Sequence, residues 1–215
     1  MTGTAKASSS MVDVYQQSFV RISHELLLLG HARLVATQLA NLEEPDITGK
    51  LCDAMEAALD ADDGPEWAPM FTVIDDQPES VAGKLGKHRP RIDVCVRCVN
   101  PRPERRFPFE AKRLHNSAAL SAYLGNEGMR ALVSGYYGEQ ALAGMIGYVQ
   151  TSTCPDWTDK IKKRLKSTPL AYQLVEPVAF VELEVKAHEP IFCSEHVKAN
   201  NDRRMRITHT LLLCA

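Results

Sequence analysis

Two neighbouring segments, 91–98 and 107–112, alternate apolar and polar residues in the way expected for β-strands. In the first segment the even-numbered residues are apolar, so Asp93 points to the opposite face. In the second segment the odd-numbered residues are apolar, and Glu110 and Lys112 point to the other face. If the two strands pair, two carboxylates and an ammonium group lie on one side of a sheet. This arrangement predicts a site for a divalent metal ion with a protein cation beside it.

The pattern resembles the catalytic motif of the PD-(D/E)XK nuclease superfamily, whose fold is called restriction-endonuclease-like. In that superfamily an Asp on one strand and a Glu-x-Lys on the next strand bind Mg²⁺ and position a water molecule against a phosphodiester. The resemblance covers the central half of the chain, from Glu44 to Val149. Asp93 follows Ile92 rather than a proline, which is a common variation of this motif.

The resemblance implies that Asp93, Glu110 and Lys112 are catalytic, with Mg²⁺ as the cofactor and Mn²⁺ able to replace it. The implied metal ligands are a carboxylate from the preceding helix and three groups of the strands, which are Asp93, Glu110 and the carbonyl oxygen of Ala111. We choose Glu44 for the helix because it precedes Ile47 by three residues and so shares its inward face. Glu43 and Glu25 are the alternatives, and capping of the helix is an equally ordinary role for Glu44.

The function implied by the resemblance is metal-dependent hydrolysis of phosphodiester bonds, with DNA as the expected substrate and an endonuclease as the expected type. Small domains of this kind resemble effectors of bacterial antiviral defence, in which a recognition or activator protein or a second copy of the chain is the partner. That role rests on analogy alone. The alternative is an inactive nuclease-like scaffold or regulatory subunit that binds protein or nucleic acid.

A second Glu-x-Lys triplet, Glu184-Val185-Lys186, follows a literal Pro155-Asp156 and competes with the first. The superfamily needs its Asp on a strand beside the triplet. Asp156, however, stands at the start of the predicted helix 157–165. The alternation over 182–186 is typical of a half-exposed strand. We therefore favour Asp93 and Glu110.

The predicted fold is one α/β domain over 11–215, with a restriction-endonuclease-like αβββαβ core, a mixed central sheet and a disordered tail over 1–10. A long helix is expected over 11–40, with Phe19, Ile22, Leu26 and Leu29 on its apolar face. The core order would be a helix from Glu44, three strands, a helix over 117–137 broken near Gly125–Gly128, and a strand over 143–149. Further strands are expected over 180–186 and 206–214.

The net charge of −2 argues against a protein that coats nucleic acid without specificity. Basic residues nevertheless cluster at 84–91 and 102–106, beside the predicted site, where they are candidates for phosphate contacts. The run 160–166 is expected to be a solvated helix face. No apolar segment is long enough to cross a bilayer and the N-terminus lacks a signal peptide, so we expect a cytoplasmic protein.

Other chemically suggestive residues are weaker candidates. The six cysteines lack zinc-type spacing and are expected to be buried and reduced. His115 is expected to be a polar residue at a helix start. Ser194 and His196, with His209 further on, lack a visible third group and oxyanion hole, which argues against a hydrolase triad. Gly144 and Gly147 do not form a nucleotide-binding motif and are expected to permit close packing of a buried strand.

Overall fold

The computed structural model describes residues 9–99, 105–138, 140–183, 185, 191–198 and 201–215. Within them a seven-stranded mixed sheet forms the centre of an α/β fold, with the strand order β1-β2-β3-β4-β7-β6-β5. The strands are β1 (Phe71–Pro78), β2 (Arg91–Cys98), β3 (Arg105–Leu114), β4 (Leu142–Val149), β5 (Val181–Leu183), β6 (Ile191–Val197) and β7 (Arg204–Leu213). The pairs β3–β4 and β4–β7 are parallel, and the other pairs are antiparallel.

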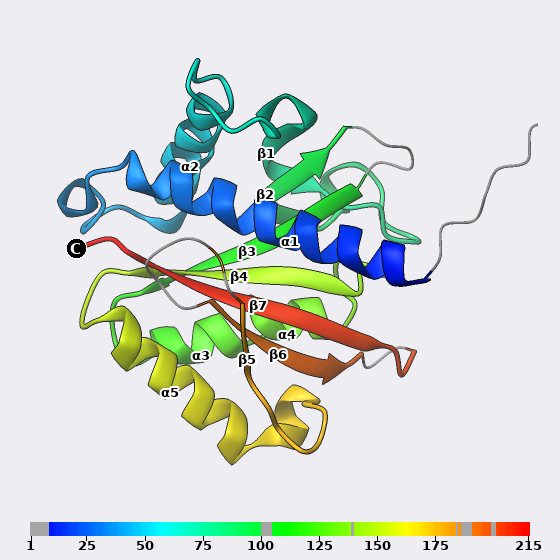
Figure 1. Ribbon diagram of the computed structural model, residues 1–215. Helices are drawn as coiled ribbons and strands as arrows, with labels where there is room; N and C mark the ends of the chain where they lie inside the picture. Colours follow the sequence, from blue (N-terminus) through cyan, green and yellow to red (C-terminus); the bar gives the residue numbers. More distant parts are fainter. Residues whose placement is uncertain (1–8, 100–104, 139, 184, 186–190, 199–200) are drawn as a thin grey trace, which may run out of the picture.

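Helices cover both faces of this sheet (Figure 1). The α-helices are α1 (Ser9–Ala32), α2 (Glu44–Leu59), α3 (Ala119–Leu124), α4 (Met129–Val133) and α5 (Cys154–Ser167). Four short 3-10 helices, η1 (Ala36–Gln38), η2 (Ala68–Met70), η3 (Gly86–His88) and η4 (Pro169–Tyr172), lie in the connections between described elements. No helix in the described part of the chain combines the length and apolar composition needed to cross a bilayer.

Each face of the sheet has its own apolar core. Residues of α1 and α2, such as Leu26 and Leu51, pack with Val94, Phe107 and Phe109 on one face. The second core, against α3, α4 and α5, includes the following residues of those helices and the sheet: Tyr123, Leu132, Ile161, Met145 and Leu211. The side chains of β2 and β3 are therefore distributed between two buried layers, as expected for strands covered by helices on both faces.

The two glycines of β4 allow this close packing, as the sequence predicts. A Cβ atom on Gly144 would lie 2.2 Å from the Phe109 ring, and one on Gly147 would lie 2.5 Å from Leu211. A side chain at either position would force its neighbours apart. Both positions therefore help to fix β4 between its parallel neighbours.

The α-helix at the N-terminus differs from the prediction at both ends. It begins at Ser9 and ends at Ala32, so it is not a helix over 11–40; residues 1–8 of the expected tail lie outside the described residues. Gly30 is in its last turn, where a Cβ atom would lie 2.4 Å from the Met55 side chain of α2. The chain turns through η1 after this close crossing, and α2 packs back against α1. The prediction that Leu29 is buried is wrong, since it is 40% exposed.

The later elements agree better with the sequence. The segment 117–137 is interrupted as expected, with α3 ending before Gly125 and α4 starting after Gly128. None of the six cysteines, all of which lie in the described residues, forms a disulfide; five are buried as expected, and Cys193 is partly exposed. Cys95 and Cys98 lie in opposite cores. Within 180–186 the described strand is limited to β5, because Glu184 and Lys186 lie outside the described residues.

Candidate functional site

The candidate site lies where β2 and β3 separate. Their paired residues run from Cys98 and Arg105 to Val94 and Phe109, so Asp93 and Glu110 come one step beyond the last pair. In the continuing ladder the next hydrogen bonds would join main-chain groups of both strands. Here the Asp93 carboxylate takes that place and accepts a 2.7 Å hydrogen bond from the Ala111 amide. The Asp93 side chain is thus held against the backbone of β3.

The main chain of Ala111 serves the site at both its polar groups. In a strand the N–H and C=O of one residue point to the same side, which here is the side of β2. The Ala111 carbonyl oxygen accepts a 2.6 Å hydrogen bond from Lys112 Nζ. The separation of the two strands therefore leaves a backbone oxygen available beside two carboxyl groups, which is the ligand role that the resemblance implies for Ala111.

Glu110 is almost fully buried, with 4% of its surface exposed. The hydroxyl of Tyr137 donates a 2.8 Å hydrogen bond to its Oε2 atom, and Lys112 Nζ lies 3.0 Å from its Oε1 atom. Burial, followed by the nearby charge of Asp93, raises the pKa of Glu110 to about 8. At neutral pH the carboxyl group of Glu110 is therefore mainly protonated as long as no further cation is present.

Lys112 lies at the centre of the group. Besides its contacts with Glu110 and the Ala111 carbonyl, its Nζ atom donates a 2.7 Å hydrogen bond to Oε1 of Glu44. Burial disfavours the charge on Lys112, but the carboxylates of Glu110, Asp93 and Glu44 outweigh it and raise the pKa of Lys112. The ammonium group is therefore charged and surrounded by oxygen atoms.

Glu44 reaches the site from the start of α2. Pro45 occupies the first turn of that helix, where its missing N–H costs no hydrogen bond. The other oxygen of Glu44 accepts a 3.2 Å hydrogen bond from the Arg113 amide, so the side chain spans from α2 to β3. Burial also raises the pKa of Asp93, against the opposing effect of Lys112.

The residues that surround Lys112 suit a divalent cation in both charge and chemistry. The ammonium group already occupies a cluster of three oxygen atoms, from Glu44, Glu110 and Ala111, at 2.6 to 3.0 Å. With all three acids ionised, Asp93, Glu44 and Glu110 exceed the charge of Lys112 by two, which one divalent ion balances. Among the described residues, no three His, Cys, Asp or Glu side chains are grouped as a preformed metal site. Lys112 lies between Glu44 and Glu110 and forms an ion pair with each of the two carboxylates.

The alternatives for the helix carboxylate lie elsewhere. Glu43 forms a 2.7 Å ion pair with Arg113, the residue after Lys112. Glu25 pairs with Arg21 one turn earlier in α1 and makes no contact with the group around Lys112. The Nε2 atom of His115 lies 2.9 Å from the Asn116 amide nitrogen, and Asn116 accepts hydrogen bonds from the first amides of the following turn.

Of the three charged residues of the competing motif, only Asp156 lies in the described part of the chain. Asp156 is in the first turn of α5 and exchanges hydrogen bonds with Thr153, so it is a helix-capping residue as predicted. Glu184 and Lys186 lie outside the described residues.

The basic cluster 84–91 is largely engaged within the protein. Arg91 forms an ion pair with Asp76, Arg89 donates to the carbonyl oxygens of Glu79 and Pro78, and Lys84 stacks over the Tyr136 ring. The run 160–166 packs aliphatic stems and ammonium groups over Trp157, Phe180 and Phe192, as a helix face does.

The serine and histidines near the C-terminus form a buried network. Ser194 Oγ lies 2.7 Å from His196 Nε2 and 2.8 Å from His209 Nε2, and Tyr123 is hydrogen-bonded to the other nitrogen of His209. Ser194 is 1% exposed and both histidines are fully buried. The network has no access for a substrate and stabilises the core between β6, β7 and α3.

Tyr137 is the site residue that the sequence does not suggest. It lies 27 positions after Glu110, in the Gly-Tyr-Tyr-Gly segment that ends α4, and its aromatic ring indicates ordinary core packing. Only the pairing of a tyrosine with a conspicuous glycine turn hints at a fixed position.

No family model, curated protein or solved structure matches this chain.

Proposed function

We propose that the protein is a metal-dependent nuclease of the PD-(D/E)XK superfamily, which hydrolyses phosphodiester bonds, with DNA as the expected substrate. The observation that carries this proposal is the convergence of Asp93, Glu110, Lys112 and the Ala111 carbonyl at one separation of two antiparallel strands. The order α2-β1-β2-β3-α3-α4-β4 supports it, since α3 and α4 together occupy the place of the second helix in the αβββαβ core of that superfamily. Support also comes from Glu44, which contributes a helix carboxylate to the same cluster.

In this proposal Asp93, Glu110, Glu44 and the Ala111 carbonyl would hold Mg²⁺ or Mn²⁺. The bound ion would supply an acidified water molecule and neutralise charge on the phosphate oxygens. Because Lys112 now contacts Glu44, Glu110 and Ala111, it would have to release at least part of these contacts. Glu110 would lose its proton at the same time, since the added positive charge favours the carboxylate.

The freed ammonium group of Lys112 is then available to the reaction. It would donate a hydrogen bond to the attacking water and stabilise the negative charge that develops around phosphorus. The water oxygen would form a bond to phosphorus and release one proton to solvent, while the bond from phosphorus to the leaving oxygen breaks and that oxygen takes up a proton from solvent. Tyr137 would keep Glu110 in position through its hydrogen bond to Oε2.

Cleavage assays test the proposal. Plasmid, linear duplex and single-stranded substrates are incubated with the protein and Mg²⁺ or Mn²⁺, with EDTA as the metal-free control. Cutting should require the metal and should be abolished in Glu110→Ala and Lys112→Ala. Glu182→Ala is the matched control, since Glu182 is an exposed acid on β5. Absence of cutting under all these conditions, including with an activating partner, favours the inactive scaffold.

A further inference from the structure

We infer that a groove between the N-terminal half of α1 and the sheet binds the phosphates of a nucleic-acid strand. The groove comprises a cavity of about 520 Å³ and a second cavity of about 330 Å³. They are continuous, because both are lined by Gln16, Ala141 and Leu142. This inference rests on the proposed nuclease function for the class of its ligand.

Arginines dominate the charge of the groove. Arg204 and Arg206 line the larger cavity, and Arg105 and Arg106 line the smaller one. Glu195 is the one acidic residue among the described lining residues, and it pairs with Arg204 at 3.3 Å. Arg106 pairs with the buried Glu79. The lining thus has a net positive charge, which favours a negatively charged polymer as the ligand.

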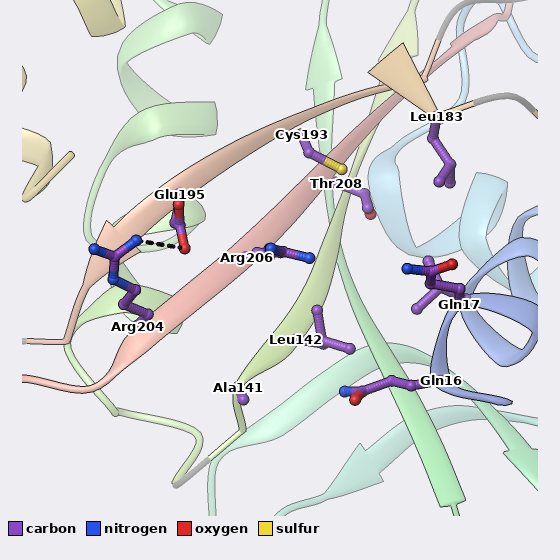
Figure 2. A pocket seen from close by; sticks show the side chains of 11 residues that line it. Gln16, Gln17, Ala141, Leu142, Leu183, Cys193, Glu195, Arg204, Arg206 and Thr208 are labelled. Atoms are coloured by element: carbon purple, nitrogen blue, oxygen red, sulfur yellow. Dashed lines mark hydrogen bonds and ion pairs between the residues drawn. The ribbon is translucent and has the colours of Figure 1, made fainter. Parts of the chain in front are cut away.

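Arg206 lies in the middle of the larger cavity. Figure 2 shows its side chain projecting from β7 between Cys193 and Leu142, with its tip toward Gln17. Among the described residues no carboxylate lies within ion-pair distance of Arg206. Its guanidinium group therefore offers a bidentate donor pair to a phosphate, and the amides of Gln16 and Gln17 add neutral donors.

The walls beside Arg206 suit the rest of a nucleotide. Leu142, Leu183 and Val20 add apolar surface to the lining of the cavity. Sugar and base faces can pack on such surface while the phosphate is bound by the arginine. A groove that combines cations with apolar walls is the arrangement by which proteins bind single strands with little sequence preference.

The groove and the candidate site share strand β3. Arg106 lines it at the start of β3, and Glu110 follows four residues later on the same strand. At about 3.3 Å per residue this separation is about 13 Å, which corresponds to roughly four nucleotide steps along a strand of duplex rise. The α1 face of β3 between these two positions is covered by the buried core around Phe107 and Phe109, so binding of a strand in the groove is tested on its own.

The test is DNA binding without metal, so that it does not depend on cleavage. Fluorescence anisotropy of a labelled single-stranded and a labelled duplex oligonucleotide is followed in EDTA at several salt concentrations. Arg206→Ala should weaken binding about fivefold, which corresponds to ~1 kcal/mol, and should lower the salt slope by about one. Lys163→Ala is the matched control, because this exposed lysine lies on α5, on the opposite face of the sheet, and should leave both values unchanged.

The outcomes separate this inference from the proposed function. Equal losses in Arg206→Ala and Lys163→Ala, or no binding by the wild type, overturn the groove. Displacement of the oligonucleotide by micromolar mononucleotide would also overturn it, since the groove would then be a small-molecule site. Metal-dependent cutting with unchanged binding in Arg206→Ala leaves the nuclease in place and removes the groove. Binding that depends on Arg206, without any cutting, supports the groove and counts against the proposed nuclease.

Discussion

Replacing Glu110 by glutamine should stabilise the metal-free protein at alkaline pH. The carboxyl group of Glu110 is buried beside Asp93, which raises its pKa from 4.5 to about 8. Because the unfolded chain ionises near 4.5, the folded state resists a deprotonation that the unfolded state has already completed. The resulting cost is absent below pH 4.5, grows as the pH rises, and is complete above pH 8.

The size of this cost follows from the same pKa values. Each pKa unit corresponds to about 1.4 kcal/mol, so a difference from 4.5 to about 8 amounts to about 5 kcal/mol at pH 9. Glutamine has nearly the same shape, keeps an acceptor for the Tyr137 hydroxyl and carries no charge that burial would penalise. The gain in Glu110→Gln should therefore approach this value at high pH and fall to about 1 kcal/mol near pH 5.

Urea denaturation in EDTA between pH 5 and pH 9 measures the effect as the difference between the two proteins. The free energy of unfolding of Glu110→Gln should rise relative to wild type across this range, with unchanged m-values. Glu182→Gln, at an exposed position, should run parallel to wild type. If the free energies of unfolding of Glu110→Gln and wild type run parallel with pH, or if wild type becomes the more stable protein as the pH rises, Glu110 is ionised without penalty. Either result would refute the reasoning.

Two further predictions concern the cation at the site and the buried histidines. Lys112→Met should bind Mn²⁺ roughly tenfold more tightly than wild type in calorimetric titration. In the variant the ion no longer competes with the contacts of Lys112 to Glu44 and Glu110, which are worth ~1.5 kcal/mol or more each. Weaker binding by the variant would contradict this. Stability should fall as the pH drops from 6.5 toward 4, because burial lowers the pKa of His24 and His196 to about 4 and only the unfolded chain binds protons in this window. Each histidine should contribute about 3 kcal/mol to the loss, so His24→Gln should flatten the urea-denaturation profile and the exposed His88→Gln should not.

The centre of the fold could be predicted because its local patterns agree with its environment. The alternation in β2 and β3 reflects two real buried layers, and it places Asp93 and Glu110 beside each other as expected. Pro45 and the acids around it marked the start of α2 because that role depends on local backbone geometry.

Other features depend on contacts between distant segments. The end of α1 lies beside the close contact of Gly30 with Met55 of α2, a contact between segments that the residue pattern of α1 does not show. The hydrogen bond from Tyr137 to Glu110 joins two segments that α3 and α4 separate in the sequence. Even the position of Lys112 between Glu44 and Glu110 needs the strand separation, which is invisible in a pattern of alternating residues.

The most direct test of the proposed nuclease is single-turnover cleavage of a labelled oligonucleotide in Mn²⁺ by wild type and Asp93→Asn. Asparagine keeps the size of the side chain and an oxygen for the Ala111 amide, so the variant should remain folded by urea denaturation. We predict metal-dependent cutting by the wild type and a loss of at least a hundredfold in Asp93→Asn, as expected for removal of a charged metal ligand. Equal rates for the two proteins, or cutting that persists in EDTA, would contradict the assignment of this site.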